Sequence, residues 1–341
     1  MKAPAVTFDR VSIVFGDEPE SALPLMDKGL DRAEVQDRTG QVLGVHDCSL
    51  RVDEGEIVVL MGLSGSGKST LLRAVNGLNP VVRGAVTVHD GAWSCIPGQC
   101  SAPDLRRLRR ECVAMVFQQF GLLPWRNVRD NVVLGLELAG VPKAERMARA
   151  DAQLELVGLE GWADRNVSEL SGGMQQRVGL ARSFATEAPI LLMDEPFSAL
   201  DPLIRTRLQD ELVDLQRKLK RTIIFVSHDL DEAFKLGDRI AIMEGGRIVQ
   251  AGTPPEIYSN PVSDYVAEFV AHMNPLGVLT AADVMQAGAG EGDEAVPAGM
   301  PIQQVMQRLA GTERPLNVER DGRIVGRVTR EDVLRKLSAA G

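Results

Sequence analysis

Cysteine, histidine and aromatic residues are scarce in this sequence. Its 341 residues include four cysteines and four histidines, and aromatic residues make up 4%. No C-x-x-C pair and no histidine pair at zinc-site spacing occurs, which excludes a zinc finger, and a reducing cytosol disfavours a disulfide framework. We therefore expect structural roles for all four thiols and for three histidines: Cys48, Cys95, Cys100, Cys112, His46, His89 and His272.

Long hydrophobic runs and an excess of positive charge are also missing. No apolar stretch reaches the length of a membrane-spanning helix, and the start MKAPAVTFDR lacks the apolar core of a secretory signal. The net charge of −9 argues against general affinity for nucleic acid and against electrostatic anchoring to anionic lipid. We therefore expect a cytosolic chain with no nucleic acid among its partners.

The composition is that of a globular protein with a sizeable core. Hydrophobic residues make up 44% of the chain and charged residues 25%, both ordinary values for folded proteins. The length exceeds that of one average domain and suits a larger and a smaller domain. The sequence predicts a first domain over residues 1–273 and a second over residues 276–341.

Four short apolar runs each end abruptly at a polar residue or glycine. They are EIVVLM before Gly62, VAMVF before Gln118, ILLM before Asp194 and TIIFVS before His228. Continuous hydrophobicity is typical of strands buried on both faces of a parallel sheet. In such α/β sheets the ligand lies beyond the carboxyl ends of the strands. If the four strands are neighbours, these polar residues meet along one edge.

Other segments of the first domain have distinct patterns. An acidic, helix-favouring stretch over residues 16–45 is inserted between two N-terminal strands, and the pattern is helical from about residue 120 to 185. EGGRIVQAG predicts a hairpin with a glycine turn. The basic stretch DLRRLRREC, from Asp104, either contacts phosphate or forms a solvated helix face, and we favour the helix face.

The last 66 residues form a small unit of their own. Ile302, Val305, Met306 and Leu309 share one helix face, and PLNVERDGRIVGRVT predicts two strands around an Asp-Gly turn. Thr329 then caps a helix with Val333, Leu334 and Leu337, whereas QAGAGEGDEAVPAG is expected to be a loop with little fixed structure. So small a unit buries little surface alone and is expected to need a partner.

A phosphate-binding loop follows the first apolar run. GLSGSGKST matches G-x-x-x-x-G-K-[ST] between a strand and a helix, a context that separates it from a chance glycine turn. Backbone N–H groups of such a loop surround phosphate, its lysine adds positive charge, and its serine offers a hydroxyl to Mg²⁺. The predicted nucleotide-binding residues here are Gly62, Leu63, Ser64, Gly65, Ser66, Gly67, Lys68, Ser69 and Thr70.

Two carboxylates follow the third apolar run. Asp194, at the end of a buried strand, is the predicted Mg²⁺ ligand together with Ser69. Glu195 is the predicted general base that polarises the attacking water. The alternative is a pair of solvated acids in a loop, which the apolar run ILLM directly before them disfavours.

His228 and Gln118 gain meaning from their positions. A lone histidine at a helix start is usually a capping residue, and glutamine is common on surfaces. Both residues, however, end strands that reach the same predicted sheet edge. There His228 could donate to the γ-phosphate, and Gln118 could reach Mg²⁺ or its water.

A second phosphate site is predicted in LSGGMQQRVGLARS, residues 170–183. Ser171 is a plausible cap, and Gly172 and Gly173 expose N–H groups at the positive end of a helix. The chain already has one phosphate loop, so a second one requires another nucleotide or another copy of the chain.

In these motifs the first 270 residues or so resemble the ATP-binding cassettes of ABC transporters. The Walker A sequence GLSGSGKS, the glutamine loop at Gln118, the signature LSGGM, the Walker B sequence ILLMDE, the D-loop SALD ending at Asp201, and the switch His228 occur in the family's order. The resemblance implies a P-loop NTPase with a mixed, largely parallel core sheet and a helical signature subdomain. It also implies a head-to-tail homodimer that buries two ATP molecules with Mg²⁺.

The helical insert and the flanks of these motifs resemble one branch of the family. That branch powers the uptake of quaternary amines such as choline, glycine betaine and proline betaine. The resemblance implies an ATPase on the cytoplasmic face of the inner membrane, bound to a permease that works with an extracytoplasmic solute-binding protein. Met174, where many cassettes have glutamine, also fits this branch. Phe15 stands where many cassettes have an adenine-stacking tyrosine, and its ring either stacks on adenine or belongs to the core.

The tail resembles a single CBS motif, a small α+β domain. GRVTRED fits a pattern by which some CBS modules bind an adenine nucleotide through Gly326, Thr329 and Asp332. Helix capping by Thr329 and Asp332 explains the same residues more simply, and we favour it. Three rival functions remain: an ABC-type mechanoenzyme on nucleic acid, a soluble P-loop kinase, and a protein that is mainly a sensor through its tail.

Overall fold

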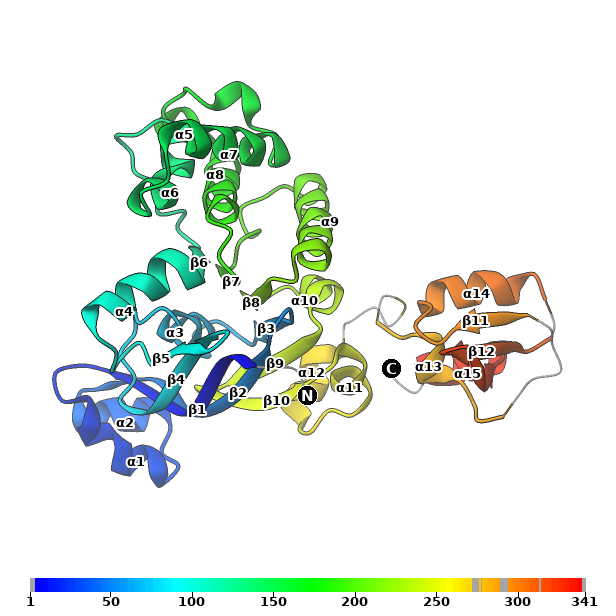
Figure 1. Cartoon of the computed structure of the whole chain (residues 1–341). Coiled ribbons are helices and arrows are strands. Elements are labelled where there is room, and N and C mark those ends of the chain that lie inside the picture. The colour runs from blue at the N-terminus through cyan, green and yellow to red at the C-terminus, as the bar shows by residue number, and fades with distance from the viewer. Residues whose placement is uncertain (1–3, 272–275, 277, 289–293, 313, 339–341) are drawn as a thin grey trace. The chain divides into compact units, whose positions relative to one another are not determined.

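The computed structural model describes residues 4–271, 276, 278–288, 294–312 and 314–338 (Figure 1). The predicted domain junction at residues 272–275, with His272, lies outside this range. The strands are β1 Pro4–Phe15, β2 Val42–Asp53, β3 Ile57–Met61, β4 Arg83–Asp90, β5 Trp93–Cys95, β6 Val113–Val116, β7 Ile190–Asp194, β8 Thr222–Val226, β9 Arg239–Glu244, β10 Arg247–Gly252, β11 Ala295–Pro297, β12 Leu316–Arg320 and β13 Arg323–Val328.

The helices alternate with these strands and cluster in two stretches of the chain. The α-helices are α1 Leu23–Asp27, α2 Arg32–Thr39, α3 Lys68–Ala74, α4 Ala102–Arg107, α5 Val128–Val132, α6 Leu134–Leu138, α7 Lys143–Leu156, α8 Gly172–Ala185, α9 Pro202–Leu219, α10 Leu230–Leu236, α11 Pro254–Ser259, α12 Asp264–Val270, α13 Ala281–Val284, α14 Ile302–Ala310 and α15 Arg330–Ser338. Short 3-10 turns are η1 Pro19–Ala22, η3 Glu160–Trp162 and η4 Val167–Glu169, and η2 Leu108–Cys112 is a π-helical turn.

The central sheet has six strands in the order β10-β9-β3-β8-β7-β6. The four apolar runs form its adjacent strands β3, β8, β7 and β6, and each neighbouring pair among them is parallel. Every residue of β3, β7 and β8 is buried. The prediction of parallel strands buried on both faces is confirmed, and it brings the carboxyl ends of all four strands to one edge.

A second sheet has the order β2-β1-β4-β5 and is antiparallel. The predicted insert lies between β1 and β2 and contains η1, α1 and α2, which pack against buried Val14 and Leu43. The expectation that the insert extends to Val45 is wrong at its end, because β2 already begins at Val42. Leu43 and Val45 are buried opposite Val14 and Ile13 of β1, so their burial requires the strand.

The segment between β6 and β7 forms the helical lobe, defined here as α5, α6, α7 and α8 (Figure 1). It corresponds to the helical pattern predicted from about residue 120 to 185. Contacts of α8 with α5, α6 and α7 make α8 the central helix of the lobe. The predicted hairpin is also present, since β9 and β10 join through Gly245 and Gly246, both with positive φ.

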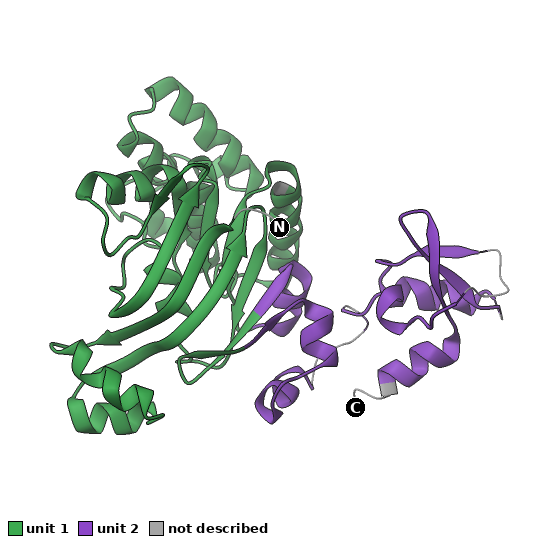
Figure 2. Cartoon of the chain, turned by 60° about the horizontal axis from the view of Figure 1, so that its bottom comes forward, with its two compact units in different colours: residues 1–228, 241–249 green, residues 229–240, 250–341 purple. Residues whose placement is uncertain are grey.

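By its internal contacts the chain separates into two compact units (Figure 2). One comprises residues 1–228 and 241–249, and the other comprises residues 229–240 and 250–341. The second unit therefore includes α10, α11 and α12 in addition to the tail, which differs from a division near residue 273. The first unit contains the helical lobe, the loop after β3, and the residues Gln118, Asp194, Glu195 and His228 at the edge of the central sheet.

The tail combines the sheet β11-β12-β13 with α13, α14 and α15. Ile302, Val305 and Leu309 are buried as predicted, whereas Met306 is 37% exposed and lies at the edge of that helix face. Asp321 and Gly322 form the predicted turn, both with positive φ. The predicted loop is wrong at Ala295–Pro297, a strand that pairs in parallel with β12 and buries Val296.

Candidate active site

The phosphate loop connects β3 to α3 and depends on glycines at two strained positions. Gly62 has φ of +139°, and a Cβ there would lie 2.1 Å from the carbonyl oxygen of Met243. Gly67, directly before α3, has φ of +99°. Side chains rarely adopt these conformations, so the loop can follow its tight path only with glycine at both positions.

A cavity of about 360 Å³ opens over this loop. Most of the predicted nucleotide-binding residues line it, together with residues of β1 and of the insert that follows it. Leu63 of the same loop is exposed, whereas the hydroxyl of Ser66 is buried and has no hydrogen-bond partner among the described atoms. The lining residues are Phe15, Arg32, Val42, Leu43, Gly44, Ser64, Gly65, Gly67, Lys68, Ser69, Thr70, Gln118 and Glu195.

Phe15 lies in the wall of this cavity and is 38% exposed. The structure therefore places its ring at a solvent-accessible surface and not in the core. The ring approaches Gly44 of β2, where a Cβ would lie 2.9 Å from its edge. An exposed aromatic face in the wall of a nucleotide-sized cavity is suited to stacking on a base.

Lys68 is the positive group of the phosphate loop. It is the first residue of α3, and its Nζ donates to the carbonyl oxygens of Gly62 (2.8 Å) and Leu63 (2.9 Å). Burial lowers the pKa of Lys68, while the nearby carboxylates of Glu195 and Asp194 act in the opposite direction. The ammonium group is thus held above the loop, beside the two predicted acidic residues.

Asp194 and Ser69 meet at the bottom of the site. The hydroxyl of Ser69 donates to Asp194 Oδ1 at 2.6 Å, and Nη2 of Arg73 donates to Asp194 Oδ2 at 2.8 Å. Asp194 is fully buried. A hydroxyl beside a carboxylate supplies the hard oxygen ligands that Mg²⁺ prefers, so these two residues fit a magnesium ion shared with phosphate.

Glu195 connects the strand ends. Its carboxylate Oε2 accepts a hydrogen bond from Gln118 Nε2 at 3.0 Å and lies 3.5 Å from His228 Nδ1. The prediction that residues after β6, β7 and β8 converge is therefore confirmed. Glu195 also has a φ of +48°, a conformation that costs free energy in a residue other than glycine and that occurs often at functional sites.

The unusual backbone of Glu195 is fixed by two neighbours. Its N–H donates to the carbonyl of Val226 on β8 (3.1 Å), and its carbonyl accepts from Nε2 of Gln176 (3.1 Å). Gln176 is buried in α8, and its Oε1 accepts from the N–H of Ala199 at 3.1 Å. The helix that begins at the signature sequence thus holds the segment between β7 and α9.

The signature residues lie at the start of α8. Ser171 is the N-cap, with its Oγ accepting from the N–H of Met174 at 3.4 Å. A Cβ on Gly173 would lie 3.2 Å from the carbonyl oxygen of Ala199, so part of the need for glycine comes from this chain itself. Gly172 is exposed, and a Cβ there would only reach ordinary contact with the ring of Phe120, at 3.9 Å.

Ser171, Gly172 and Gly173 are not among the residues that line the cavity over the phosphate loop. Asp201 is likewise absent from that lining and caps α9 by accepting from the N–H of Ile204 at 3.0 Å. The predicted site residues therefore form two groups in one chain. One group lies in or next to the cavity, and the other, with Ser171, Gly172, Gly173 and Asp201, lies at the starts of α8 and α9.

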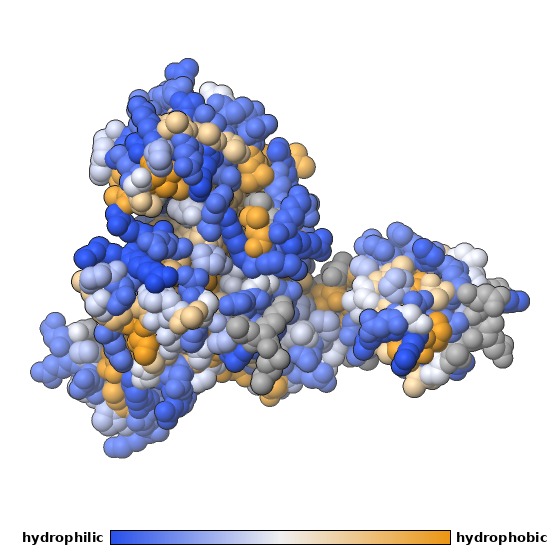
Figure 3. Space-filling view, in the orientation of Figure 1, coloured by the Kyte–Doolittle hydropathy of each residue, from blue (hydrophilic) through white to orange (hydrophobic). Residues whose placement is uncertain are grey.

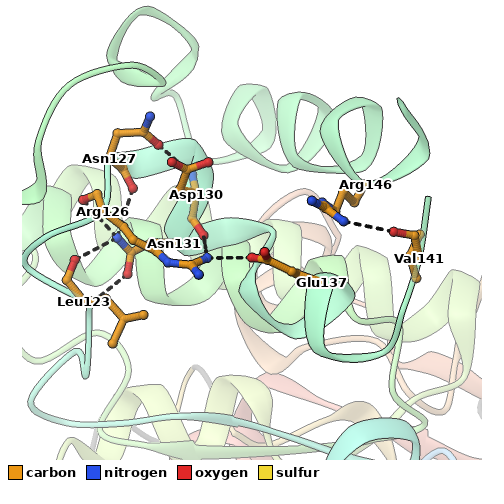
Figure 4. Close-up of polar contacts among 8 residues, drawn as sticks. All are labelled: Leu123, Arg126, Asn127, Asp130, Asn131, Glu137, Val141 and Arg146. Atoms are coloured by element: carbon orange, nitrogen blue, oxygen red, sulfur yellow. Dashed lines mark hydrogen bonds and ion pairs between the residues drawn. The ribbon is translucent and has the colours of Figure 1, made fainter. Parts of the chain in front are cut away.

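A buried side chain of α5 makes several hydrogen bonds to the loop after Gln118 (Figure 4). Asn131 of α5 is fully buried, and its Oδ1 accepts from the N–H of Leu123 at 2.7 Å. Its Nδ2 donates to the carbonyls of Leu123 (3.1 Å), Arg126 (3.3 Å) and Asn127 (2.9 Å). One amide thus replaces the backbone pairing that this irregular loop lacks.

A second cavity, of about 380 Å³, lies beside this loop. Arg182 of α8 reaches from it to the carbonyls of Phe120 (2.9 Å) and Gly121 (2.8 Å), and burial lowers the pKa of Arg182. We call this cavity the lobe groove, and its wall comprises Asn76, Leu78, Arg109, Arg110, Val113, Ala114, Met115, Phe117, Gly121, Leu134, Gly135, Leu138, Arg182, Ser183 and Thr186. The face shown in Figure 3 is mostly hydrophilic with scattered apolar patches.

The basic stretch from Asp104 forms α4 and η2, and three of its four arginines make contacts within the chain. Arg107 lies over the ring of Trp93 at 4.5 Å, and Arg109 Nε donates to the carbonyl of Asn76 at 2.9 Å. Arg110 donates to the carbonyl of Leu138. These contacts agree with a structural helix and not with a phosphate site.

In the tail, the residues of the GRVTRED pattern are occupied by contacts of the tail itself. Asp332 accepts from the hydroxyl of Thr329 (2.6 Å) and from Nε2 of Gln286 (2.6 Å). A Cβ on Gly326 would lie 2.7 Å from the carbonyl oxygen of Gln286. The structure thus has the capping arrangement that we favoured, with Gly326 required for close packing.

Sequence analysis missed three side chains of the site, Arg32, Arg73 and Gln176. Arg73, which holds Asp194, lies four residues after Ser69 in the same helix, a spacing that places both on one face and could have identified it. Gln176 lies within the signature helix, but nothing in the local pattern distinguishes it from the neighbouring glutamine at position 175.

Comparisons with known proteins agree with this geometry. A family model described as "ABC transporter" matches residues 45–198, and one described as "CBS domain" matches residues 294–339. The glycine betaine/proline betaine transport system ATP-binding protein ProV of Salmonella typhimurium is 46% identical over 96% of this chain and 81% of its own length. The trimethylamine N-oxide transport system ATP-binding protein TmoW of Ruegeria pomeroyi is 45% identical over 99% of both chains.

The fold is also similar to that of a solved ATP-binding cassette. That structure is a dimer in a post-hydrolysis state with bound ADP and Pi. It covers 73% of this chain and 98% of its own, with a TM-score of 0.63 and 28% sequence identity. Within the described ranges of the present chain, every helix is too short or too polar to cross a lipid bilayer.

Proposed function

Because this chain belongs to the family of ABC transporter ATP-binding subunits, we propose that it hydrolyses ATP to power the uptake of a small betaine-type amine. The observation that carries this proposal is identity of 45–46% with transport ATP-binding proteins over nearly the whole chain, tail included. Neither a mechanoenzyme on nucleic acid nor a soluble kinase gains such support. The substrate class rests on the relatives.

At the cavity, Lys68 and the backbone N–H groups of residues 62–70 bind the phosphates of ATP, and Phe15 stacks on adenine. The buried hydroxyl of Ser66, which has no hydrogen-bond partner among the described atoms, supports this assignment. Ser69 and Asp194, with Gln118, hold Mg²⁺, which neutralises charge on the phosphate oxygens when it is bound.

Glu195 is the general base in this proposal. Its carboxylate is held by Gln118 at 3.0 Å, and His228 at 3.5 Å is placed to donate to the γ-phosphate. An incoming water gives its proton to the Glu195 carboxylate as its oxygen attacks the γ-phosphorus, and the bond to the β–γ bridging oxygen breaks. The products are ADP and phosphate.

Two copies of the chain complete the site. Ser171, Gly172 and Gly173 of one copy face the γ-phosphate held by the other copy's Lys68, and Asp201 lies at the same interface. Two facts support this: the signature residues do not line their own chain's cavity, and the helix start at Ser171 is exposed. A similar cassette was solved as a dimer. Hydrolysis removes the γ-phosphate link, and the dimer opens.

The lobe groove is the proposed binding site for a cytoplasmic loop of the permease. It lies beside the loop that carries Gln118, so closing of the dimer and movement of the permease are joined through one segment. In this proposal the chain lies peripherally on the cytoplasmic face of the inner membrane. An extracytoplasmic solute-binding protein delivers the substrate to the permease and meets this subunit only indirectly.

Trimethylamine N-oxide is a second candidate substrate. The relative of that specificity aligns with 99% of both chains, whereas the glycine betaine/proline betaine relative extends beyond the aligned part. The compounds share methyl groups on a formally positive nitrogen and a negatively charged oxygen, so one permease pocket chemistry suits either.

Reconstitution tests the proposal. The chain, its permease and its solute-binding protein are placed in liposomes, and phosphate release is measured with choline, glycine betaine, proline betaine and trimethylamine N-oxide in turn. We expect one of these compounds to stimulate hydrolysis, and the Glu195→Gln variant in the same liposomes to show no stimulation. A transporter that hydrolyses ATP but responds to none of the four would refute the substrate class and leave the ATPase assignment intact.

A further inference from the structure

One positive side chain in the cavity comes from the insert and not from the cassette motifs. Arg32 is the first residue of α2, whose start is fixed by a capping box between Asp31 and Glu34. Its Nη2 donates to the carbonyl oxygen of Gly44 at 2.6 Å, and its Nη1 donates to the carbonyl oxygen of Gly65 in the phosphate loop. The insert thus reaches the phosphate loop through a guanidinium group.

The surroundings of this guanidinium are bare backbone. A Cβ on Gly67 would lie 3.4 Å from Arg32 Nη2, and one on Gly246 would lie 3.0 Å from the same atom. A side chain at either position would press on the guanidinium. Glycine at positions 67 and 246 therefore lets Arg32 lie directly against the phosphate loop and the β9–β10 turn.

Arg32 forms no ion pair with the described residues of the chain. Its Nε is buried without a hydrogen-bond partner, and no carboxylate among the described residues lies within ion-pair distance of it. Burial lowers the pKa of Arg32, and no acidic group acts against that. A guanidinium remains charged in such a site and has donors in a fixed fork that suit phosphate oxygens.

We propose that Arg32 is a nucleotide-binding residue supplied by the insert, which contacts the phosphate chain of the nucleotide and holds the phosphate loop through Gly65. This inference rests on the proposed function of the cavity as an ATP site. It gives the insert a direct part in nucleotide affinity. Lys68 and Arg32 both line the cavity, so in this proposal two positive side chains bind the phosphates, one from the phosphate loop and one from the insert.

The test compares variants in a Glu195→Gln background, where binding is measured without turnover. Arg32→Ala and Arg32→Lys are the test variants, and Arg38→Ala, exposed in the last turn of the same helix, is the matched control. Dissociation constants are measured by fluorescence with a methylanthraniloyl-labelled ATP, and by competition with ATP, ADP and adenosine. Melting temperatures without nucleotide report on folding.

We expect Arg32→Ala to weaken ATP and ADP binding about tenfold or more, the loss typical of a charge-assisted hydrogen bond, and to leave adenosine binding unchanged. Arg32→Lys keeps the positive charge but lacks the forked donors, so we expect its ATP affinity to lie between those of the unsubstituted chain and Arg32→Ala. If the alanine variant does not fold, the affinity of Arg32→Lys decides the question. Wild-type ATP affinity with only a lower melting temperature, or an equal loss in Arg38→Ala, would overturn the inference. Failure of the background chain itself to bind MgATP would instead refute the proposed function.

Discussion

The amide of Gln118 donates a 3.0 Å hydrogen bond to the carboxylate of Glu195, across 77 residues of sequence. Gln118 lies in the loop that leads from β6 into the helical lobe, and Glu195 directly follows the buried strand β7. A displacement of that loop therefore removes a donor from the proposed general base. This contact gives a direct route from the lobe groove to the chemistry.

Replacing Glu195 with glutamine removes the proposed base and keeps the shape of the side chain. We expect ATP binding to persist, hydrolysis to fall about 10²- to 10⁴-fold, and a dimer to accumulate with MgATP. Phosphate release and light scattering after size exclusion measure the two effects. Hydrolysis at the wild-type rate in this variant would exclude Glu195 as the base.

Replacing Asn131 with leucine removes the side chain that fixes the loop after Gln118. Four hydrogen bonds to the backbone are lost, although the carbonyls of Leu123 and Asn127 keep a backbone donor, so we expect the free energy of unfolding to fall by about 1–3 kcal/mol. In liposomes, substrate stimulation should fall more than the basal ATPase rate of the chain alone. Denaturant unfolding and the two ATPase assays check this, and an unchanged ratio of stimulated to basal rate would count against the loop's coupling role.

Glycine at position 62 should tolerate no side chain. In Gly62→Ala the Cβ meets the carbonyl of Met243 at 2.1 Å in a strained conformation, and we expect a loss of roughly 2–4 kcal/mol in the free energy of unfolding. Gly98→Ala is the control, since nothing lies within 4 Å of a Cβ there. Equal stability of the two variants in urea would show that the strand end relaxes freely.

Acid should destabilise the chain through His46. This ring is buried, and its Nδ1 lies 2.5 Å from Nη2 of Arg247. Burial, together with the charge of Arg247, holds the pKa of His46 below its usual range, although Asp27 at 3.5 Å acts against this. The folded chain therefore disfavours the protonated ring, and the stability present above the unfolded pKa is lost as the pH falls through the folded pKa.

Melting temperatures between about pH 5 and pH 7 test this effect, because the unfolded pKa of histidine is about 6.5. The wild-type chain should lose more stability on acidification than His46→Gln, whose side chain does not titrate. Parallel melting curves for the two proteins across this range would show that another group controls the acid response.

Only one of the four thiols should react in the folded chain. Burial raises the pKa of Cys48 and of Cys95 to about 12 and that of Cys112 to about 11, which leaves little thiolate near neutral pH. Cys100 is partly exposed. A thiol reagent should therefore label a single site, Cys100, until denaturant is added, and peptide mapping identifies the labelled residue. Fast labelling of Cys48 or Cys112 in the folded chain would contradict the burial described here.

The sheet edge was predictable because its information is local. Each apolar run ends beside its functional residue, and the carboxyl ends of parallel strands share an edge, so the convergence of Gln118, Glu195 and His228 follows from order along the chain. Arg73 was also within reach, one helical turn after Ser69. In the tail, the helix face at Ile302 and the turn at Asp321 and Gly322 were also predictable from local pattern, whereas the CBS-like fold came from the resemblance of the tail to that family.

Other contacts have no local signal. Arg32 binds carbonyl oxygens of Gly44 and Gly65, 12 and 33 residues away, and every residue has such an oxygen. The strand Ala295–Pro297 forms because it pairs with β12. Its proline- and glycine-rich flanks favour a loop, so the local sequence does not indicate this strand. Likewise, the start of β2 at Val42 follows from burial against β1 and not from the preceding helix-favouring residues.

Gln176 ties the start of α8 to both Glu195 and Ala199 of its own chain. In the proposed dimer, where Ser171 at the N-cap of that same helix contacts the neighbour's nucleotide, α8 would link this nucleotide to the proposed general base of its own chain's site. Loss of phosphate from one site would then alter the contacts of Glu195 in the other site. Hydrolysis at the two sites would therefore be coupled and not independent.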